Sequence, residues 1–206
     1  MTTADARAPG GYPVRARVER FRGAIFQVVT DTVAMPDGDL ADRDYLRHPG
    51  SVAVVPYHEP TGEVVLVRQY RHPVGGHLWE LPAGLLDHDG ETLPQVAHRE
   101  LFEEADLACG RLDLLVDLHT SPGCSSEWIR VFLARDLAPT GAVHPRRHEE
   151  ATIVAARFPL PEAVEMVLAG RVTNATAVAG LLAAARARDL GWGPLRPVDE
   201  PAPAPR

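Results

Sequence analysis

Three glutamates stand close together in the sequence: Glu100, Glu103 and Glu104. In a helix, Glu100 and Glu104 would lie about 40° apart and Glu103 about 60° to the other side, so all three project within roughly 100°. Carboxylates four residues apart repel each other, whereas a divalent cation between them reverses the sign. The cluster therefore indicates a magnesium site, because Mg²⁺ prefers a few carboxylates together with substrate phosphates. From these three residues alone, a solvated acidic helix face is the alternative.

The helix that carries these glutamates has its own start signal. Thr92 followed by Gln95 is the pattern of a capping box, in which the side chains satisfy the first backbone amides. Leu93, Ala97 and Leu101 recur every four residues, which predicts a buried stripe on a different face from the glutamates. The sequence therefore predicts a helix with one face for the core and one for chemistry.

The segment from Gly84 to Leu107 resembles the signature of the Nudix hydrolases, G-x5-E-x7-R-E-U-x-E-E-x-G-U, where U is aliphatic. Seven of its nine specified positions stand here in order and spacing. Two positions depart: six residues rather than five separate Gly84 from Glu91, and Asp106 replaces the glycine just after the helix. Left-handed backbone is often required there, and Asp tolerates it better than most residues. Neither departure removes a metal ligand that the signature implies.

The resemblance implies metal-dependent hydrolysis of a nucleoside diphosphate linked to another group. In the family, two or three metal ions bridge the diphosphate, neutralise its charge and lower the pKa of the attacking water. Magnesium is the expected metal, with manganese as the alternative. Arg99 is expected to orient a neighbouring glutamate, and Glu91 to support the loop. The implied metal ligands are the Ala83 carbonyl and the carboxylates of Glu100, Glu103, Glu104 and Glu150, and the implied catalytic residues are Arg99, Glu103, Glu104 and Glu150.

A second acidic segment, His148–Glu150, lies in a polar stretch before a predicted strand at Thr152. In the family, a glutamate from this loop binds metal and deprotonates the water. We favour Glu150 over Glu149 by its position, and a solvated loop is the alternative. The segment is not a zinc motif, because no second histidine stands at helical spacing.

Outside the signature, the chain resembles the ADP-ribose pyrophosphatases within the Nudix hydrolases from Gly23 to about Gly180. The likeness is strongest at residues 68–72, 78–84 and 121–123, and Pro122 stands fifteen residues after Leu107, where this subfamily carries a proline. The resemblance implies hydrolysis of ADP-ribose to AMP and ribose 5-phosphate. The alternatives are another nucleoside diphosphate sugar or dinucleotide as substrate, or a sensor that binds ADP-ribose without cutting it. Sensors tend to lose signature glutamates, and this chain keeps them.

Several residues are expected to contact the substrate. Phe26 resembles an N-terminal aromatic on which adenine stacks, and its alternative is a core position in a small sheet. Arg71 suits a diphosphate because a guanidinium binds phosphate oxygens in pairs, and its alternative is a surface ion pair. The full set implied by the resemblance is Phe26, Arg71, Trp79, Glu80, Pro122 and Gly123.

Composition limits the remaining possibilities. The 206 residues, of which 45% are hydrophobic, suffice for one ordinary core and a small accessory element. A net charge of -7 argues against a protein that coats nucleic acid. The longest apolar run, residues 177–185, is far shorter than the ~20 residues of a membrane span, and the start lacks the apolar core of a signal peptide. Cys109 and Cys124 suggest neither zinc nor a disulfide framework, so the protein is expected in the cytoplasm.

We divide the chain into four parts: a flexible leader (1–13), an N-terminal β accessory domain (14–50), a Nudix hydrolase domain (51–195) and a Pro-rich flexible tail (196–206). A turn signal at residues 35–38 predicts a hairpin from the segments 24–32 and 39–46. This region is too short to bury a core alone, and the resemblance implies a homodimer in which it reaches the other subunit's active site.

The rest of the chain predicts a mixed sheet between helical layers. Together with the resemblance, this gives the fold class α/β: a Nudix-type α/β/α sandwich with a small N-terminal antiparallel sheet. Strands are expected at 51–57, 64–69, 78–81, 112–119, 128–137 and 152–158, and later helices start near Pro161 and Asn174 and end before Gly170 and Gly191.

Overall fold

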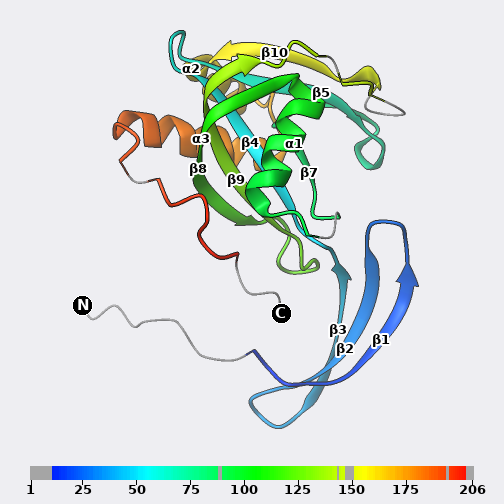
Figure 1. Cartoon of the computed structure of the whole chain (residues 1–206). Helices are drawn as coiled ribbons and strands as arrows, with labels where there is room; N and C mark the ends of the chain where they lie inside the picture. Colours follow the sequence, from blue (N-terminus) through cyan, green and yellow to red (C-terminus); the bar gives the residue numbers. More distant parts are fainter. Residues whose placement is uncertain (1–10, 88–89, 143, 147–150, 194, 203–206) are drawn as a thin grey trace, which may run out of the picture.

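The computed structural model describes residues 11–87, 90–142, 144–146, 151–193 and 195–202. Its strands form two separate sheets, and the smaller one projects from the main body (Figure 1). The smaller sheet is antiparallel, in the order β1-β2-β3. Its strands are β1 (Val14–Arg22), β2 (Gln27–Ala34) and β3 (Leu40–Arg47).

The larger sheet has seven strands in the order β10-β5-β4-β9-β8, with β6 paired to β5 and β7 paired to β4. Only the pair of β4 and β9 is parallel. Its strands are β4 (Ser51–His58), β5 (Glu63–Arg71), β6 (Gly76–Glu80), β7 (Ala83–Leu85), β8 (Leu107–His119), β9 (Trp128–Pro139) and β10 (Val154–Pro159).

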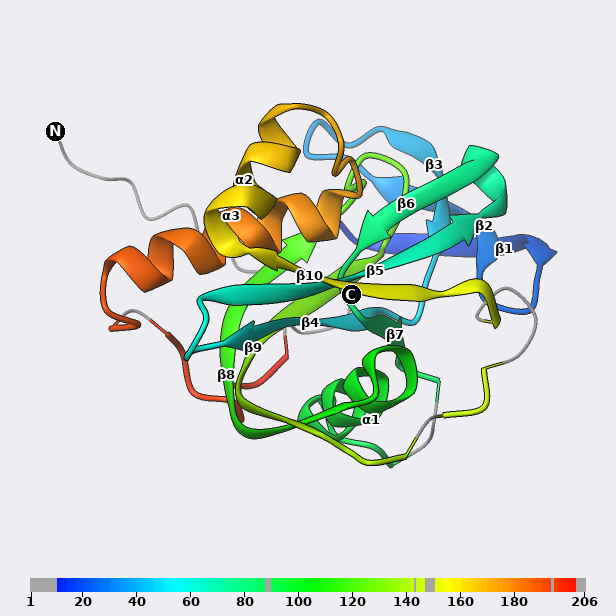
Figure 2. The same ribbon diagram turned by 90° about the horizontal axis from the view of Figure 1, so that it is seen from above.

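Helices cover both faces of the larger sheet. Helix α1 lies on one face, and α2 and α3 lie on the other (Figure 2). The predicted α/β/α sandwich with a small N-terminal antiparallel sheet is therefore confirmed. The helices are α1 (Leu93–Ala105), α2 (Leu160–Leu168) and α3 (Ala175–Asp189), with a short 3-10 turn, η1 (His72–Val74).

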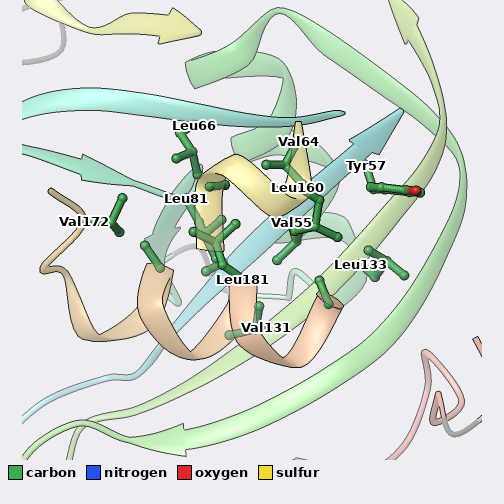
Figure 3. Close-up of a cluster of buried hydrophobic side chains, with 14 of the residues drawn as sticks. Val55, Tyr57, Val64, Leu66, Leu81, Val131, Leu133, Leu160, Val172 and Leu181 are labelled. Atoms are coloured by element: carbon green, nitrogen blue, oxygen red, sulfur yellow. The ribbon is translucent and has the colours of Figure 1, made fainter. Parts of the chain in front are cut away.

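Two apolar cores hold this sandwich together. Strand β4 is buried on both faces, so its side chains reach the two cores alternately. Val55 and Leu181 belong to the core under α2 and α3 (Figure 3), and Val54 and Leu101 to the core under α1. Full burial of one such apolar side chain contributes roughly 1.5–3 kcal/mol to the free energy of unfolding. Both cores therefore fix α1 and α3 relative to the sheet.

The smaller sheet confirms the predicted hairpin and adds a strand. Gly38 donates to the Met35 carbonyl at 3.0 Å in the turn between β2 and β3, and its positive φ of 94° suits glycine. Strand β1 was not predicted, and its nine residues are all exposed. Its residues Val14–Glu19 alternate apolar and polar side chains, which is the pattern of a half-buried strand, so a local signal was present.

Some boundaries differ from those expected, because pairing with a neighbour overrides local signals. Strand β8 begins at Leu107, five residues before the expected start, although Gly110 weakens the strand pattern. Its first residues pair with the end of β9, where Leu107 faces Pro139. Strand β7 was not predicted, because it has only three residues and follows directly after Pro82.

The segment predicted to begin a flexible tail at residue 196 is held against the larger sheet as far as Pro201. Arg196 pairs with Leu114 of β8 through two backbone hydrogen bonds of 3.1 Å. Arg130, only 1% exposed, donates to the Glu200 and Pro201 carbonyls. The buried arginine and the contact of Val198 with the core under α1 thus hold this segment. No helix in the described part of the chain is long and apolar enough to cross a membrane.

Candidate active site

Helix α1 begins and ends as its sequence predicts. Thr92 and Gln95 form the expected capping box: the Thr92 amide donates to Gln95 Oε1 at 2.8 Å, and the Gln95 amide donates to Thr92 Oγ1 at 3.4 Å. At the other end Asp106 has left-handed backbone, with φ 54° and ψ 34°. This conformation costs an ordinary residue roughly 1–2 kcal/mol and is more accessible to Asp.

Two of the three glutamates are buried rather than solvated. Glu100 and Glu104 are each 7% exposed and face strand β7. Glu104 Oε2 accepts a hydrogen bond of 3.0 Å from the Ala83 amide. The Glu100 carboxylate lies against Gly84, where an added Cβ would collide with it. A solvated helix face is thus excluded for Glu100 and Glu104. Gly84 is needed because the Glu100 carboxylate approaches its backbone closely, and not because of a positive φ.

Arg99 supplies positive charge to this carboxylate group. Its guanidinium donates to Glu91 at 3.1 Å, to Glu100 at 2.5 Å and to Glu103 at 3.4 Å. Burial works to lower the pKa of Arg99, but the hydrogen bond to Glu91 and the charges of Glu100 and Glu103 raise it overall. Arg99 therefore stays charged and links the loop before α1 to the face of the helix.

The donor set fits a hard cation such as magnesium. Glu100, Glu103 and Glu104 offer only oxygen atoms, which Mg²⁺ prefers, and the contact at Gly84 brings one carboxylate against the backbone of β7. Within the described ranges, no three carboxylate, imidazole or thiolate groups converge on one point, and Arg99 lies among the glutamates instead. The predicted ligand Glu150, with Glu149, lies outside the described residues.

Strand β7 connects the glutamates to a cavity of about 410 Å³. Ala83 and Gly84 line it together with Arg71 and Glu80. Arg71 Nη2 donates to Glu80 Oε2 at 2.6 Å, and Glu80 is 3% exposed. The ion pair considered for Arg71 therefore exists, and the same guanidinium borders the cavity. The structure thus brings three predicted site residues, Arg71, Glu80 and Ala83, to one cavity beside α1.

A second cavity, of about 490 Å³, contains Phe26 in its wall. Both cavities are bordered by Ile25 and His48, so they adjoin. Phe26 is 39% exposed, which excludes the alternative of a core position. Their sizes match the range of small-molecule sites, about 300–1,000 Å³. Phe26 and Arg71 therefore border adjoining parts of one concave region.

Three predicted substrate residues line neither cavity. Trp79 packs edge-on against Phe158, with ring centroids 5.2 Å apart, and contacts the core under α2 and α3. Pro122 and Gly123 are exposed in the turn between β8 and β9. The ends of that turn do reach the region, because Thr120 and Glu127 line the first cavity.

Sequence reasoning missed Glu127. Glu127 Oε2 accepts a 2.6 Å hydrogen bond from Thr120 Oγ1, and Oε1 lies 3.7 Å from His48 Nδ1. Two segments distant in the sequence meet at this carboxylate: His48, just after β3, and the connection between β8 and β9 that carries both Thr120 and Glu127. Glu127 lies outside the Nudix signature, and no pattern in the sequence predicted this contact.

The N-terminus of α3 also faces the first cavity, through Asn174, Ala175 and Thr176. Asn174 caps the helix by accepting a 2.9 Å hydrogen bond from the Ala177 amide. The sequence predicted a helix start here but not its position in space. The positive end of a helix favours anions, so this wall of the cavity suits phosphate groups.

Comparisons with known proteins place the chain in a family. The model of the NUDIX domain family matches residues 47–179. The chain is 44% identical over 177 residues to an ADP-ribose pyrophosphatase of Mycobacterium tuberculosis, covering 86% of this chain and 84% of that protein. It is 34% identical over 123 residues to an ADP-ribose pyrophosphatase of Bacillus subtilis, covering 60% and 65%. A solved structure described as an ADP compounds hydrolase shares the fold, with a TM-score of 0.73 at 22% identity over 91% of this chain and 99% of that one.

Proposed function

The chain belongs to the NUDIX family, and we propose that it hydrolyses the diphosphate bond of ADP-ribose to give AMP and ribose 5-phosphate. The observation that carries this proposal is the burial of Glu100 and Glu104 against β7, beside a cavity that Arg71 borders. Burying two carboxylates is costly unless they are paired or bind a cation. The names of the two relatives support ADP-ribose as the substrate.

The metal requirement is part of the proposal. Glu100, Glu103 and Glu104 would hold magnesium, or manganese, with the Ala83 carbonyl and Glu150 as further ligands. Bound metal ions would neutralise the diphosphate and lower the pKa of the attacking water. Arg99 keeps the glutamates oriented, since it contacts Glu91, Glu100 and Glu103. We assign Glu150 the role of taking the proton from the water.

Substrate recognition would be divided between the two cavities. Arg71 and the N-terminus of α3 would contact the diphosphate, because both offer N–H donors and positive charge. Phe26 would stack on the adenine in the adjoining cavity. Glu80 would hold Arg71 in place through their ion pair. For Trp79, Pro122 and Gly123 we propose indirect roles, through the core and the turn that carries Glu127.

We further propose a homodimer in which the small sheet of each subunit reaches the other's site. The small sheet supports this arrangement, because Val14, Val18 and Phe21 of β1 are about half exposed and its own strands leave them uncovered. Light scattering combined with activity measurement tests this: a monomer with full activity would contradict it. The predicted cytoplasmic location remains a prediction.

The function is tested by incubating the protein and Mg²⁺ with ADP-ribose, NADH, GDP-mannose, diadenosine polyphosphates and 8-oxo-dGTP, followed by product identification. We expect the highest kcat/KM for ADP-ribose, with AMP and ribose 5-phosphate as products, and loss of turnover with EDTA. Greater efficiency on GDP-mannose or a dinucleotide would contradict the proposed substrate. Tight ADP-ribose binding without turnover of any substrate would favour a sensor.

A further inference from the structure

Asp106 stands where the family signature has glycine, at the end of the helix that carries the clustered glutamates. Glycine would satisfy the left-handed backbone at this position without a side chain. The chain instead places a carboxylate there. Its contacts show what that carboxylate does.

Both oxygens of the Asp106 carboxylate bind the connection between β9 and β10. Oδ1 accepts a hydrogen bond of 2.9 Å from the His144 amide, and Oδ2 accepts one of 2.8 Å from Arg146 Nη2. The Asp106 carbonyl accepts two further hydrogen bonds of 3.2 Å from the amide and hydroxyl of Thr140. One residue thus binds this connection at three positions.

Arg146 joins the same connection directly to α1. Its Nε donates to the Glu103 carbonyl at 2.8 Å, in the last turn of the helix, where a cation is favoured. The His144 ring lies edge-on to Phe102, with centroids 5.7 Å apart. The connection is therefore tied to the backbone of a residue in the glutamate cluster.

The hydrogen bonds that join Asp106 and Glu103 to residues 140–146, called the tie below, lie close in the sequence to the predicted loop glutamates. Glu149 and Glu150 follow Arg146 by three and four residues, and β10, paired with β5, begins soon after at Val154. Arg146, the last described residue before these two glutamates, is thus held at the end of α1.

We propose that Asp106 is a positioning residue, which ties His144 and Arg146 to the end of α1 so that the loop carrying Glu149 and Glu150 starts from a fixed point beside the metal-binding helix. This inference rests on the proposed function, because it assigns the loop glutamates a part in metal binding or catalysis. The aspartate at the signature's glycine position then serves the reaction without touching the substrate.

The test compares two Asp→Gly variants. Asp136 also has left-handed backbone, with φ 53°, and in the described part of the chain its carboxylate makes no hydrogen bond. D106G and D136G therefore share the backbone change, and only D106G removes the tie. R146A, which removes the partner instead, serves as a second variant should D106G fold poorly.

For ADP-ribose hydrolysis, we expect D106G to lower kcat about tenfold with little change in KM, because a small displacement of a reacting group costs rate. D136G should match the wild type. In a background with E149Q and E150Q together, D106G should have no further effect, because the residue acts through those carboxylates. An equal loss in both backgrounds, or equal kcat for D106G and D136G, would overturn the inference.

Hydrogen exchange gives a readout that does not depend on activity. The His144 amide should exchange faster in D106G and R146A than in the wild type and D136G, whereas amides in α3 should be unchanged. Unchanged exchange at His144 in both variants would refute the tie. Failure of the wild type to cleave ADP-ribose would contradict the proposed function, and the exchange data would still decide on the tie.

Discussion

The two sheets of this protein are stabilised in different ways. The larger sheet has an apolar core on each face, including Val54 and Val55 from the same strand. In the smaller sheet, Val29 is the only buried apolar side chain of strands β1 to β3, and buried polar groups such as Thr30 and Asp31 lie beside it. Arg17, Asp31 and Tyr45 bond across its three strands. One sheet can hold groups rigidly, and the other depends on polar pairs and on its neighbours.

The proposed metal site and the proposed adenine site lie in these two different parts of the molecule. The clustered glutamates lie on a helix packed on the larger sheet, whereas Phe26 belongs to the smaller sheet, just before β2. The two parts meet where Leu46 exchanges hydrogen bonds of 2.8 Å with Cys124 and Ser126. Changes at the glutamates of α1 should therefore lower kcat, and changes at Phe26 should raise KM.

The largest effect is expected for Glu104 on the larger sheet. E104Q keeps the shape and an oxygen acceptor for the Ala83 amide but removes the charge that a metal needs. We expect kcat to fall by about 10³–10⁴, or about 4–5 kcal/mol of barrier, and the Mg²⁺ concentration for half-maximal rate to rise. Steady-state kinetics across a Mg²⁺ titration measures both. E162Q, at an exposed position on α2, is the control, and equal kinetics of the two variants would argue against a metal role for Glu104.

Gly84 tests whether close approach matters apart from charge. In G84A the added methyl group would push the Glu100 carboxylate away from β7, so we expect kcat to fall about 10²-fold. Gly76 in β6 is a matched control, because an added Cβ there meets nothing within 4 Å. Thermal unfolding checks that G84A remains folded. A fully active, folded G84A would mean that the position of Glu100 at β7 is unimportant.

Phe26 tests the smaller sheet. F26A should raise KM for ADP-ribose about tenfold with little change in kcat, because the loss of stacking costs about 1–2 kcal/mol. Leu40 of β3 is 62% exposed and lines neither cavity, so L40A is the control on the same sheet. If F26A lowered kcat instead, the division between the sheets would be wrong.

The smallest effect concerns the polar pairs of the smaller sheet. The hydrogen bond from Arg17 lowers the pKa of the Asp31 carboxyl, so this carboxylate stabilises the folded sheet above its ordinary pKa, and that contribution is lost as the pH falls through the lower folded value. An ion pair with one exposed partner is worth at most about 1 kcal/mol, or about 2–4 °C in Tm. Between pH 5 and pH 3, the wild type should lose slightly more Tm than D31N. An identical loss in both would show that Asp31 does not contribute.

Much of the fold could be predicted, because most of its elements carry local signals. The hairpin turn at residues 35–38, the cap at Asn174 and the apolar runs of β4 and β5 all lie within a few residues of the structure they specify. β7 was missed because its three residues carry no such signal, and β1 was missed although Val14–Glu19 alternates apolar and polar residues. They exist because a neighbouring strand pairs with them.

The residues of the site show the same contrast between local signals and contacts with distant segments. The shared helix face of Glu100, Glu103 and Glu104, the helix start at Thr92 and the left-handed backbone of Asp106 could be predicted, because these properties depend on residues within one or two turns. The contact of Gly84 with Glu100, the position of Glu127 at the cavity and the binding of Arg146 to Asp106 could not be predicted. Those contacts join distant segments, and the packing of helices on the sheet, which no local pattern encodes, sets their distances.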